Sequence, residues 1–239
     1  MLFHKILVTG CGGDIGLAVG RILQETKITD SVVGCDIEED HAGRVFFDRC
    51  FAMERAASPK YRERLMQLVE DEQIDLVIPT SEPELRLLYV NHFFGRRALF
   101  LMANDTALEI GFDKYKTAEF LREHDLPYPW TQKALDGAPR ELPCILKSRT
   151  GCGSKAVHVL TEETYHEGTV YHEDDIFQEW IAGEEEYTCG LFRSASGEIR
   201  SMILRRKLRG GLTGCGTVEE NPAIEALLTS LAEVLELRG

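Results

Sequence analysis

Short apolar runs alternate with helical spacings along the first hundred residues. The runs, each short enough to predict a buried strand, lie at 5–9, 31–36, 74–79 and 98–101. Between them, a helix is predicted over about 15–24, and another over 61–72, where Leu65, Leu68 and Val69 share one helical face. Strands separated by helices predict a parallel, doubly wound sheet and therefore an α/β fold.

The pattern changes near residue 104. A helix is predicted over 113–124, and it must end before Pro127, which cannot continue it. Beyond it, the predicted strands lie at 143–147, 156–160, 187–193 and 198–205. The last predicted helix has Asn221 as its N-cap and Pro222 at its first position. Its apolar stripe consists of Ile224, Leu227, Leu228, Leu231, Val234 and Leu235.

Composition narrows the class of protein. The 44% of hydrophobic residues is ordinary for a soluble globular chain, and the net charge of −13 argues against nucleic acid as the main partner. No apolar run approaches the ~20 residues of a membrane span, and the start of the chain does not fit a signal peptide. We therefore expect a cytoplasmic protein that binds neither nucleic acid nor membrane.

The cysteines predict neither disulfides nor a metal site. The seven are Cys11, Cys35, Cys50, Cys144, Cys152, Cys189 and Cys215. Their number is odd and none forms a C-x-x-C pair, so the spacing supports no disulfide framework and no zinc site. Reduced thiols are the expectation.

A first glycine-rich loop, 10–16, lies between a predicted strand and helix. Glycines there let backbone N–H groups at the helix start face an anion, and Asp36 follows at the distance of a ribose-binding acid. These features favour an NAD(P)-dependent epimerase or reductase. The alternative is a sharp turn in a Rossmann-like domain, and no tyrosine is followed four residues later by the lysine that such a reductase needs.

A second glycine-rich loop follows Lys147. Its candidate phosphate-binding residues are Gly151, Cys152, Gly153 and Ser154. A glycine loop between antiparallel strands can fold over nucleotide phosphates, and Lys147 would add a fixed point charge. The sequence is not a Walker loop. The alternative is a solvated hairpin.

The segment 177–187 has the pattern E-x-I-x-G-x-x-E-Y, from Glu179 to Tyr187. This pattern resembles that of ATP-grasp enzymes, E-x-[IL]-x-G-x-x-E-[YF]. The resemblance implies that Glu179, Trp180 and Ile181 lie against the adenine, largely through backbone groups, and that Glu186 accepts hydrogen bonds from the ribose.

Other segments fall in the order of this family, across nearly the whole chain. Asp113–Thr117 (DKYKT) resembles the start of its ATP-binding half, where Lys114 can reach phosphate, and 143–147 resembles the strand of the nucleotide lysine. The order is similar to that of the carbamoyl-phosphate synthase large subunit. The implied domains are a Rossmann-like one over 1–103, a first ATP-grasp subdomain over 104–175, and a second, incomplete one over 176–239.

The resemblance also implies a reaction. ATP would phosphorylate a small-molecule carboxylate, and an amine or thiol would displace phosphate from the acyl-phosphate. The basic cluster Arg205, Arg206, Lys207 and Arg209 could face the triphosphate, with Lys207 and Arg209 as the better candidates. A charged edge strand is the alternative. No catalytic residue is assigned.

The magnesium ligands of the family, an acid and an E-x-N pair, would lie beyond Gly239. The resemblance thus implies ATP and Mg²⁺ as cofactors, but no metal ligand within these residues. The chain alone is expected to be inactive, whether trimmed, split or degenerate. The expected partner is a second copy of the chain, in a homodimer, or a complementing C-terminal polypeptide. The alternative function is that of a non-catalytic nucleotide-binding protein.

Overall fold

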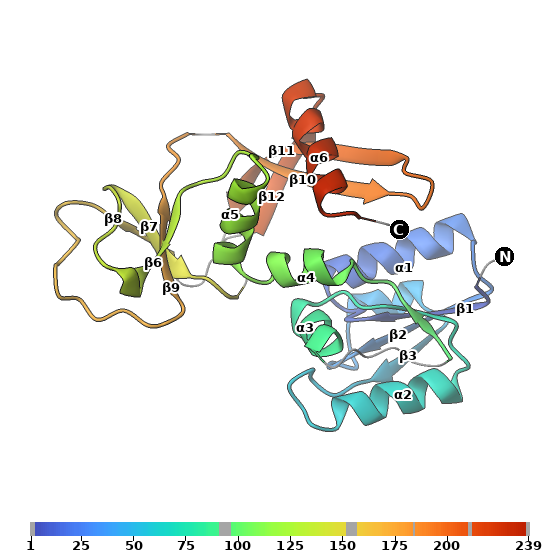
Figure 1. Ribbon diagram of the computed structural model, residues 1–239. Helices are drawn as coiled ribbons and strands as arrows, with labels where there is room; N and C mark the ends of the chain where they lie inside the picture. The colour runs from blue at the N-terminus through green and yellow to red at the C-terminus, as the bar shows by residue number, and fades with distance from the viewer. Residues whose placement is uncertain (1–2, 91–96, 152–156, 184, 210–211, 238–239) are drawn as a thin grey trace. The chain divides into compact units, whose positions relative to one another are not determined.

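The computed structural model describes residues 3–90, 97–151, 157–183, 185–209 and 212–237. The chain divides into two compact units, Met1–Met102 and Ala103–Gly239 (Figure 1). Each unit has its own sheet or sheets and its own core. None of the described helices combines the length and apolarity needed to cross a membrane.

The first unit contains a parallel sheet of five strands in the order β3-β2-β1-β4-β5. The strands are β1 (Lys5–Thr9), β2 (Ser31–Asp36), β3 (Arg49–Ala52), β4 (Leu76–Ile78) and β5 (Leu99–Phe100). All neighbouring pairs are parallel. The predicted α/β fold with an N-terminal parallel sheet is thereby confirmed. The strand order reverses between β1 and β4, which is where doubly wound sheets form their crevice.

Helices cover both faces of this sheet. They are α1 (Asp14–Thr26), α2 (Tyr61–Asp71) and α3 (Glu82–Val90), with a 3₁₀ turn η1 (Ala42–Phe46). Alternate residues of β1 point to opposite faces. Ile6 and Val8 therefore pack in the cluster that contains Leu23 of α1, whereas Leu7 packs in the cluster that contains Leu65 of α2.

The second unit begins with two capped helices, α4 (Asp105–Gly111) and α5 (Lys114–Glu123). An antiparallel sheet follows, in the order β6-β9-β7-β8. Its strands are β6 (Thr131–Lys133), β7 (Cys144–Ser148), β8 (Val157–Leu160) and β9 (Asp175–Glu179), with a 3₁₀ turn η2 (Ala134–Asp136) after β6. One face of this sheet is closed by Trp130, which packs with Cys144 and Phe177.

The last three strands form a separate antiparallel sheet in the order β10-β11-β12. They are β10 (Glu186–Arg193), β11 (Ile199–Arg209) and β12 (Leu212–Val218), and helix α6 (Pro222–Val234) packs against β10 and β11. Asn221 caps α6 as predicted, because its side chain accepts a hydrogen bond from the amide of Ile224 at 3.2 Å. A tight turn at 194–197 joins β10 to β11, with Gly197 at a φ of +88°.

Candidate functional site

Two lysines converge where the second glycine-rich loop begins. Lys114 is the first residue of α5, and its Nζ donates a hydrogen bond to the carbonyl oxygen of Gly151 at 2.8 Å. Lys147 lies in β7, four residues before Gly151. Burial lowers the pKa of Lys147 below its usual value, and the positive charge of Lys114 lowers it further. The two ammonium groups therefore act on one another in a partly desolvated place.

Strand pairing places Lys147 in a polar row. Ile145 of β7 pairs with Gln178 of β9, so Gln178 and Lys147 lie on the same face of the sheet. The Nζ of Lys147 donates to Oε1 of Gln178 at 2.5 Å, and Nε2 of Gln178 donates to the hydroxyl of Thr131 at 2.8 Å. Thr131, Gln178 and Lys147 thus connect β6, β9 and β7 through side chains.

Neither lysine has a carboxylate partner among the residues that the structure describes. Lys114 is bound to a backbone carbonyl and Lys147 to a neutral amide. Partly buried charges are usually paired with an opposite charge, because desolvation otherwise opposes the charged form. The arrangement is suited to an anion that would contact both ammonium groups.

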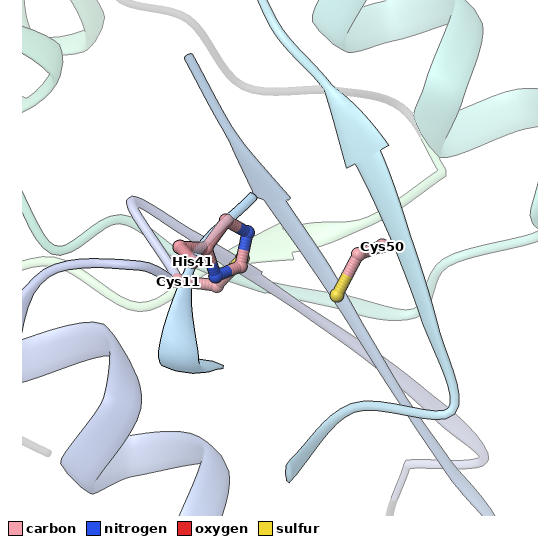
Figure 2. Close-up of side chains that lie close together, drawn as sticks. All are labelled: Cys11, His41 and Cys50. Carbon is pink, nitrogen blue, oxygen red and sulfur yellow. The ribbon is translucent and has the colours of Figure 1, made fainter. Parts of the chain in front are cut away.

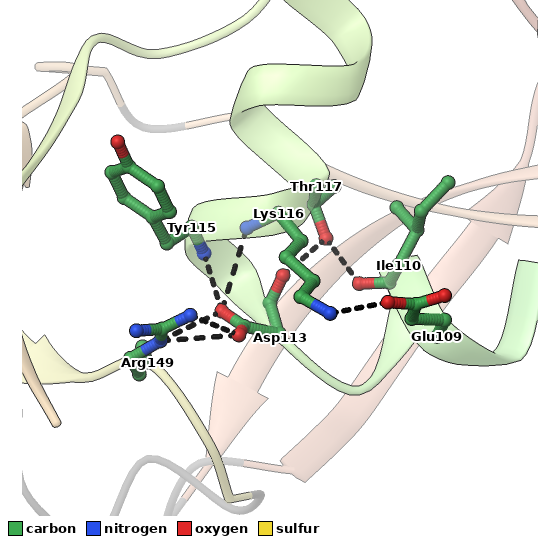
Figure 3. Close-up of polar contacts among 7 residues, drawn as sticks. All are labelled: Glu109, Ile110, Asp113, Tyr115, Lys116, Thr117 and Arg149. Carbon is green, nitrogen blue, oxygen red and sulfur yellow. Dashed lines mark hydrogen bonds and ion pairs between the residues drawn. The ribbon is translucent and has the colours of Figure 1, made fainter. Parts of the chain in front are cut away.

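An ion pair fixes the end of α5 that carries Lys114 (Figure 3). The carboxylate of Asp113 accepts hydrogen bonds from the amides of Tyr115 and Lys116 and caps the helix. Arg149 donates to the same carboxylate through Nε, at 3.1 Å to both oxygens, and through Nη2 at 2.5 Å. The amide of Lys114 donates to the carbonyl of Arg149 at 2.9 Å.

These contacts set both the charge of Asp113 and the position of Lys114. Burial alone would raise the pKa of Asp113, but the hydrogen bonds and charge of Arg149 and the helix amides lower it overall. Asp113 and Arg149 neutralise one another, so the charge that remains for a ligand is that of the lysines. Gly151 has a φ of +101°, a conformation that suits glycine.

The predicted adenine-binding residues lie at the end of β9 and directly after it. The amide of Glu179 donates to the carbonyl of Trp130 at 2.9 Å, and its carboxylate accepts from the amide of Trp130 at 3.1 Å. Glu179 is therefore anchored, whereas Trp180 is 45% exposed and Ile181 is 69% exposed. Two large apolar side chains directly after an anchored residue offer surface to a planar, apolar ligand.

The remaining predicted residues lie in several places. Glu186 opens β10, is exposed, and is paired in register with Arg206. Lys207 and Arg209 are both exposed on β11. Cys152, Gly153 and Ser154 lie outside the described residues.

A cavity of about 310 Å³ lies beside the basic segment of β11. Its lining includes Glu185, Arg205, Arg206 and Lys207 but not Arg209. Arg205 is paired with Glu219 at 2.5 Å and with Glu185 at 3.7 Å, so its charge is neutralised within the sheet. Lys207 is the better-placed candidate of this segment for an anion.

Three residues of the lysine site were not predicted: Arg149, Gln178 and Thr131. Gln178 lies inside the quoted 177–187 segment, and Arg149 lies two residues after Lys147. No local pattern indicated their partners, because each contact joins positions at least 31 residues apart.

The first glycine-rich loop borders a cavity of about 630 Å³ at the crevice of the parallel sheet. Oδ2 of Asp36 accepts a hydrogen bond from the amide of Gly12 at 2.8 Å, so this acid holds the loop rather than facing the crevice alone. Of the charged side chains that line the cavity, five are carboxylates and one is an arginine. Such a lining disfavours a pyrophosphate and gives no support to nicotinamide binding.

Comparisons with solved structures show what fold the chain has. It matches N5-carboxyaminoimidazole synthetase from Staphylococcus aureus complexed with ADP at 16% identity and a TM-score of 0.76, covering 98% of this chain and 63% of that one. It matches biotin carboxylase from Campylobacter jejuni at 15% identity and a TM-score of 0.72, and the match covers 99% of this chain and 60% of that one. It matches L-amino acid ligase from Bacillus licheniformis at 15% identity and a TM-score of 0.69, and the match covers 97% of this chain and 60% of that one.

At these identities the likeness shows the fold alone, and the chain spans about three fifths of the length of these proteins. No curated protein matches the chain. A family model described as the ATP-grasp domain matches residues 112–239, which is more than half of the chain. That segment contains both lysines, the second glycine-rich loop and the E-x-I-x-G-x-x-E-Y pattern. The chain belongs to the ATP-grasp family.

Proposed function

We propose that this chain binds ATP in the unit Ala103–Gly239 and is the nucleotide-binding part of an ATP-grasp ligase that activates a carboxylate. The observation that carries the proposal is the pair Lys114 and Lys147. Both side chains lie near the start of the glycine-rich loop, and neither has a described carboxylate partner. Nucleotide phosphates would supply the missing negative charge.

The proposed contacts follow from the placement of the side chains. Lys114, Lys147 and the loop from Gly151 to Ser154 would hold phosphates. Trp180 and Ile181 would lie against the adenine, with Glu179 positioning them through its two contacts with Trp130. Glu186 would accept hydrogen bonds from the ribose hydroxyls, and Lys207 and Arg209 stay candidates for a further anion.

The proposed reaction has two steps. A carboxylate oxygen of the substrate attacks the γ-phosphorus of ATP, the bond from that phosphorus to the bridging oxygen breaks, and ADP leaves. The resulting acyl-phosphate is then attacked by an amine nitrogen or a thiol sulfur, which loses its proton as phosphate departs. Positioning and charge neutralisation account for most of such catalysis, and the lysines would contribute both.

Magnesium bound with the nucleotide would supply further neutralisation of phosphate charge. It prefers oxygen ligands, whereas the one cluster of three ligand-bearing side chains found among the described residues offers two sulfurs and a nitrogen. The described residues therefore do not fit this ion, and no step of the reaction is assigned to it.

The finer features of the prediction remain proposals. The structural neighbours are named as a synthetase, a carboxylase and an amino acid ligase, which supports a carboxylate-activating ligase without selecting carbamoyl-phosphate chemistry. We also propose the domain limits 1–103, 104–175 and 176–239. The proposed partner is a second copy of the chain or a complementing polypeptide.

The nucleotide site is tested by thermal unfolding with ATP, ADP or NAD(P)H, on the native chain and on Lys147→Ala. At a hundredfold excess over Kd, a ligand bound to the native state stabilises it by about 2.7 kcal/mol. We expect ATP and ADP to stabilise the native chain and to have no effect on Lys147→Ala. Lys116→Ala is the matched control: this lysine lies on the same helix and pairs with Glu109, so the nucleotide effect should persist. Stabilisation by NAD(P)H alone would overturn the proposal.

The ligase step is tested separately. Hydroxylamine converts an acyl-phosphate to a hydroxamate. With ATP, Mg²⁺ and hydroxylamine, a panel of small carboxylic acids should yield a hydroxamate for the true substrate class when the proposed complementing polypeptide is present, and none with this chain alone. Nucleotide binding with no hydroxamate and no ADP release even in the presence of that polypeptide would instead favour the non-catalytic alternative.

A further inference from the structure

Three side chains that could bind a metal ion meet in the first unit, which contains none of the residues of the proposed nucleotide site. Cys11 lies in the turn after β1, His41 precedes η1, and Cys50 belongs to β3 (Figure 2). Their ligand atoms all lie within 4.8 Å of one another. The three come from separate segments, so the fold and not a local motif brings them together.

We propose that Cys11, His41 and Cys50 form a binding site for a divalent metal ion that favours sulfur ligands, of which Zn²⁺ is the representative. The site would use two thiolates and one imidazole nitrogen. It is independent of the proposed nucleotide function, because none of its residues belongs to the unit that contains Lys114 and Lys147.

The spacing of the ligand atoms fits tetrahedral coordination. Zn–S bonds of about 2.3 Å and Zn–N bonds of about 2.0 Å at tetrahedral angles separate the sulfur and nitrogen by about 3.5 Å and two sulfurs by about 3.8 Å. Sγ of Cys11 lies 3.6 Å from Nε2 of His41, and the three-atom set spans at most 4.8 Å. Small side-chain rotations would bring the third ligand to bonding distance.

The donor set selects the ion by its chemistry. Thiolate and imidazole favour zinc and similar soft or borderline ions, whereas magnesium and calcium require oxygen. Two thiolates also balance the charge of a divalent cation, so the occupied site would be neutral. Binding would release the two S–H protons, one from each cysteine, and leave His41 neutral.

The cysteines do not have the properties of reactive thiols. Cys11 is fully buried, and burial, with smaller contributions from Cys50 and Asp36, raises its pKa to about 12. Burial also raises the pKa of Cys50. A low thiol pKa marks a nucleophile or redox centre, so a catalytic role has no support. A bound divalent cation would displace the S–H protons and neutralise the thiolates, which burial alone disfavours.

The histidine is not explained by ordinary hydrogen bonding. Its Nδ1 is buried without a hydrogen-bond partner in the part of the chain that the structure describes, and its Nε2 faces a sulfur. Buried polar atoms are almost always hydrogen-bonded, so the surroundings of this ring are unusual. Coordination through Nε2 would use the nitrogen that already faces the sulfur of Cys11, and Nδ1 keeps no partner among the described residues.

Glycines allow the cluster to form. A Cβ on Gly34 would lie 2.7 Å from Sγ of Cys11, and one on Gly12 would lie 2.8 Å from the ring of His41. Side chains at these positions would displace the ligands. The cluster therefore occupies a space that the sequence leaves open on two sides.

The site is accessible to an ion. His41 and Cys50 line a cavity of about 200 Å³, and the same cavity is bordered by Glu38 and Glu39. These carboxylates would attract a cation toward the ligands, although Arg44 on the same rim opposes this in part. With three protein ligands, the fourth position would face this cavity and could take water or an exogenous ligand.

The test uses the full chain, purified under reducing conditions. Metal content is measured by mass spectrometry of the elements, and Co²⁺ titration reports thiolate ligation through its charge-transfer absorption. We expect one zinc or cobalt ion per chain for the native protein. Removal of one ligand, in Cys50→Ser or His41→Ala, should weaken binding by more than about 100-fold, because the loss of an outer-shell partner alone costs about 10- to 100-fold.

Cys189→Ser and Cys215→Ser are the matched controls, because both remove a cysteine from the other unit and should leave the stoichiometry unchanged. Circular dichroism in the presence of a chelator checks that each variant is as folded as the metal-free native chain. The proposal is overturned if the reduced native chain takes up no zinc or cobalt at micromolar concentrations, or if the ligand variants bind as the controls do. A disulfide between Cys11 and Cys50 that persists in reductant would overturn it as well.

Discussion

At the scale of single residues, Lys147 shows how a binding site opposes stability. Its ammonium group is partly buried near Lys114 and hydrogen-bonded to an uncharged amide, which lowers its pKa. Such a charge disfavours the folded state when no anion is bound, because the unfolded chain hydrates it fully. A site that awaits a polyanion is expected to carry this penalty.

We therefore predict that Lys147→Met, which keeps the length of the side chain but removes its charge, does not destabilise the nucleotide-free protein at pH 7. The folded pKa lies below the ordinary 10.5, so between the two values the unfolded state binds more protons. The stability of the native chain relative to Lys147→Met should therefore rise as pH approaches 10.5. Urea unfolding at a series of pH values measures the difference. A relative loss of native stability with rising pH would show that Lys147 is stabilised by an anionic partner.

Glu84 carries a different single-residue prediction. Its carboxylate is 6% exposed and accepts hydrogen bonds from the hydroxyls of Thr9 at 2.9 Å, Tyr61 at 2.6 Å and Ser81 at 2.6 Å. Burial raises the pKa of Tyr61, and the negative charge of Glu84 raises it further. The carboxylate thus joins β1, α2 and the start of α3.

We expect Glu84→Gln to lower the free energy of unfolding of the first unit by about 1–3 kcal/mol, since an amide offers one acceptor oxygen in place of two. Glu82→Gln is the control. Its partly exposed ion pair with Arg86 should contribute no more than about 1 kcal/mol. Denaturant unfolding of both variants decides the matter, and equal losses would mean that the buried network contributes nothing beyond a surface pair.

The same scale shows why the sequence could not reveal the cluster of Cys11, His41 and Cys50. Zinc sites are recognised by ligands a few residues apart, but these three are separated by 30 and 9 positions. Their approach depends on β2 lying between β1 and β3 in the sheet. The spacing of the cysteines along the chain therefore predicted no zinc site, whereas in the folded chain the three ligand atoms lie within 4.8 Å of one another.

At the scale of elements, Asp113 combines a helix cap with an ion pair, and two variants separate these roles. Asparagine caps a helix about as well as aspartate but cannot pair with Arg149, whereas alanine does neither. We expect Asp113→Ala to destabilise the second unit by about 2–4 kcal/mol and Asp113→Asn by roughly half as much.

The pH dependence of this element has a definite sign. The folded pKa of Asp113 lies below its usual 3.8, so its contribution is fully present above that value and is lost as pH falls through the folded pKa. Acid unfolding of Asp113→Asn should lack this loss. If both variants unfold alike at every pH, the pair with Arg149 does not stabilise α5.

Elements with a strong pattern could be predicted, and elements held by their neighbours could not. The strands Lys5–Thr9 and Ser31–Asp36 agree with the predicted 5–9 and 31–36, because each is a continuous apolar run. β12 was missed: its sequence, Leu-Thr-Gly-Cys-Gly-Thr-Val, has no apolar alternation, and it becomes a strand by pairing with β11. The four-residue β3 is similar, since it is defined by its register with β2.

The candidate site divides in the same way. Lys114 and Lys147 could be chosen from the sequence because each adjoins a recognisable segment. Gly151 was also a candidate, but its contact with Lys114 and the contact of Lys147 with Gln178 could not be predicted, because hydrogen bonds across 37 and 31 residues depend on how β7 lies against α5 and β9.

At the scale of the whole molecule, two proposed ligands would act on different units. The nucleotide would bind within Ala103–Gly239, whose core contains Trp130 and Phe177, and the metal ion within Met1–Met102, whose cores lie on the two faces of the parallel sheet. Each ligand stabilises the segments that it contacts by mass action, and amide exchange reports such stability segment by segment.

We predict that ADP slows amide hydrogen exchange in β7, β9 and the first turn of α5, and leaves β1, η1 and β3 unchanged. A zinc chelator should speed exchange in β1, η1 and β3 and leave β7, β9 and α5 unchanged, because the ion would connect the turn after β1 to η1 and β3. Hydrogen-exchange mass spectrometry on one sample, with each ligand added or removed in turn, makes the comparison. Lys147→Ala should lose the first effect and keep the second, and Cys50→Ser should do the opposite. Crossed effects, in which either variant loses both responses, would mean that the two units do not respond to their ligands independently.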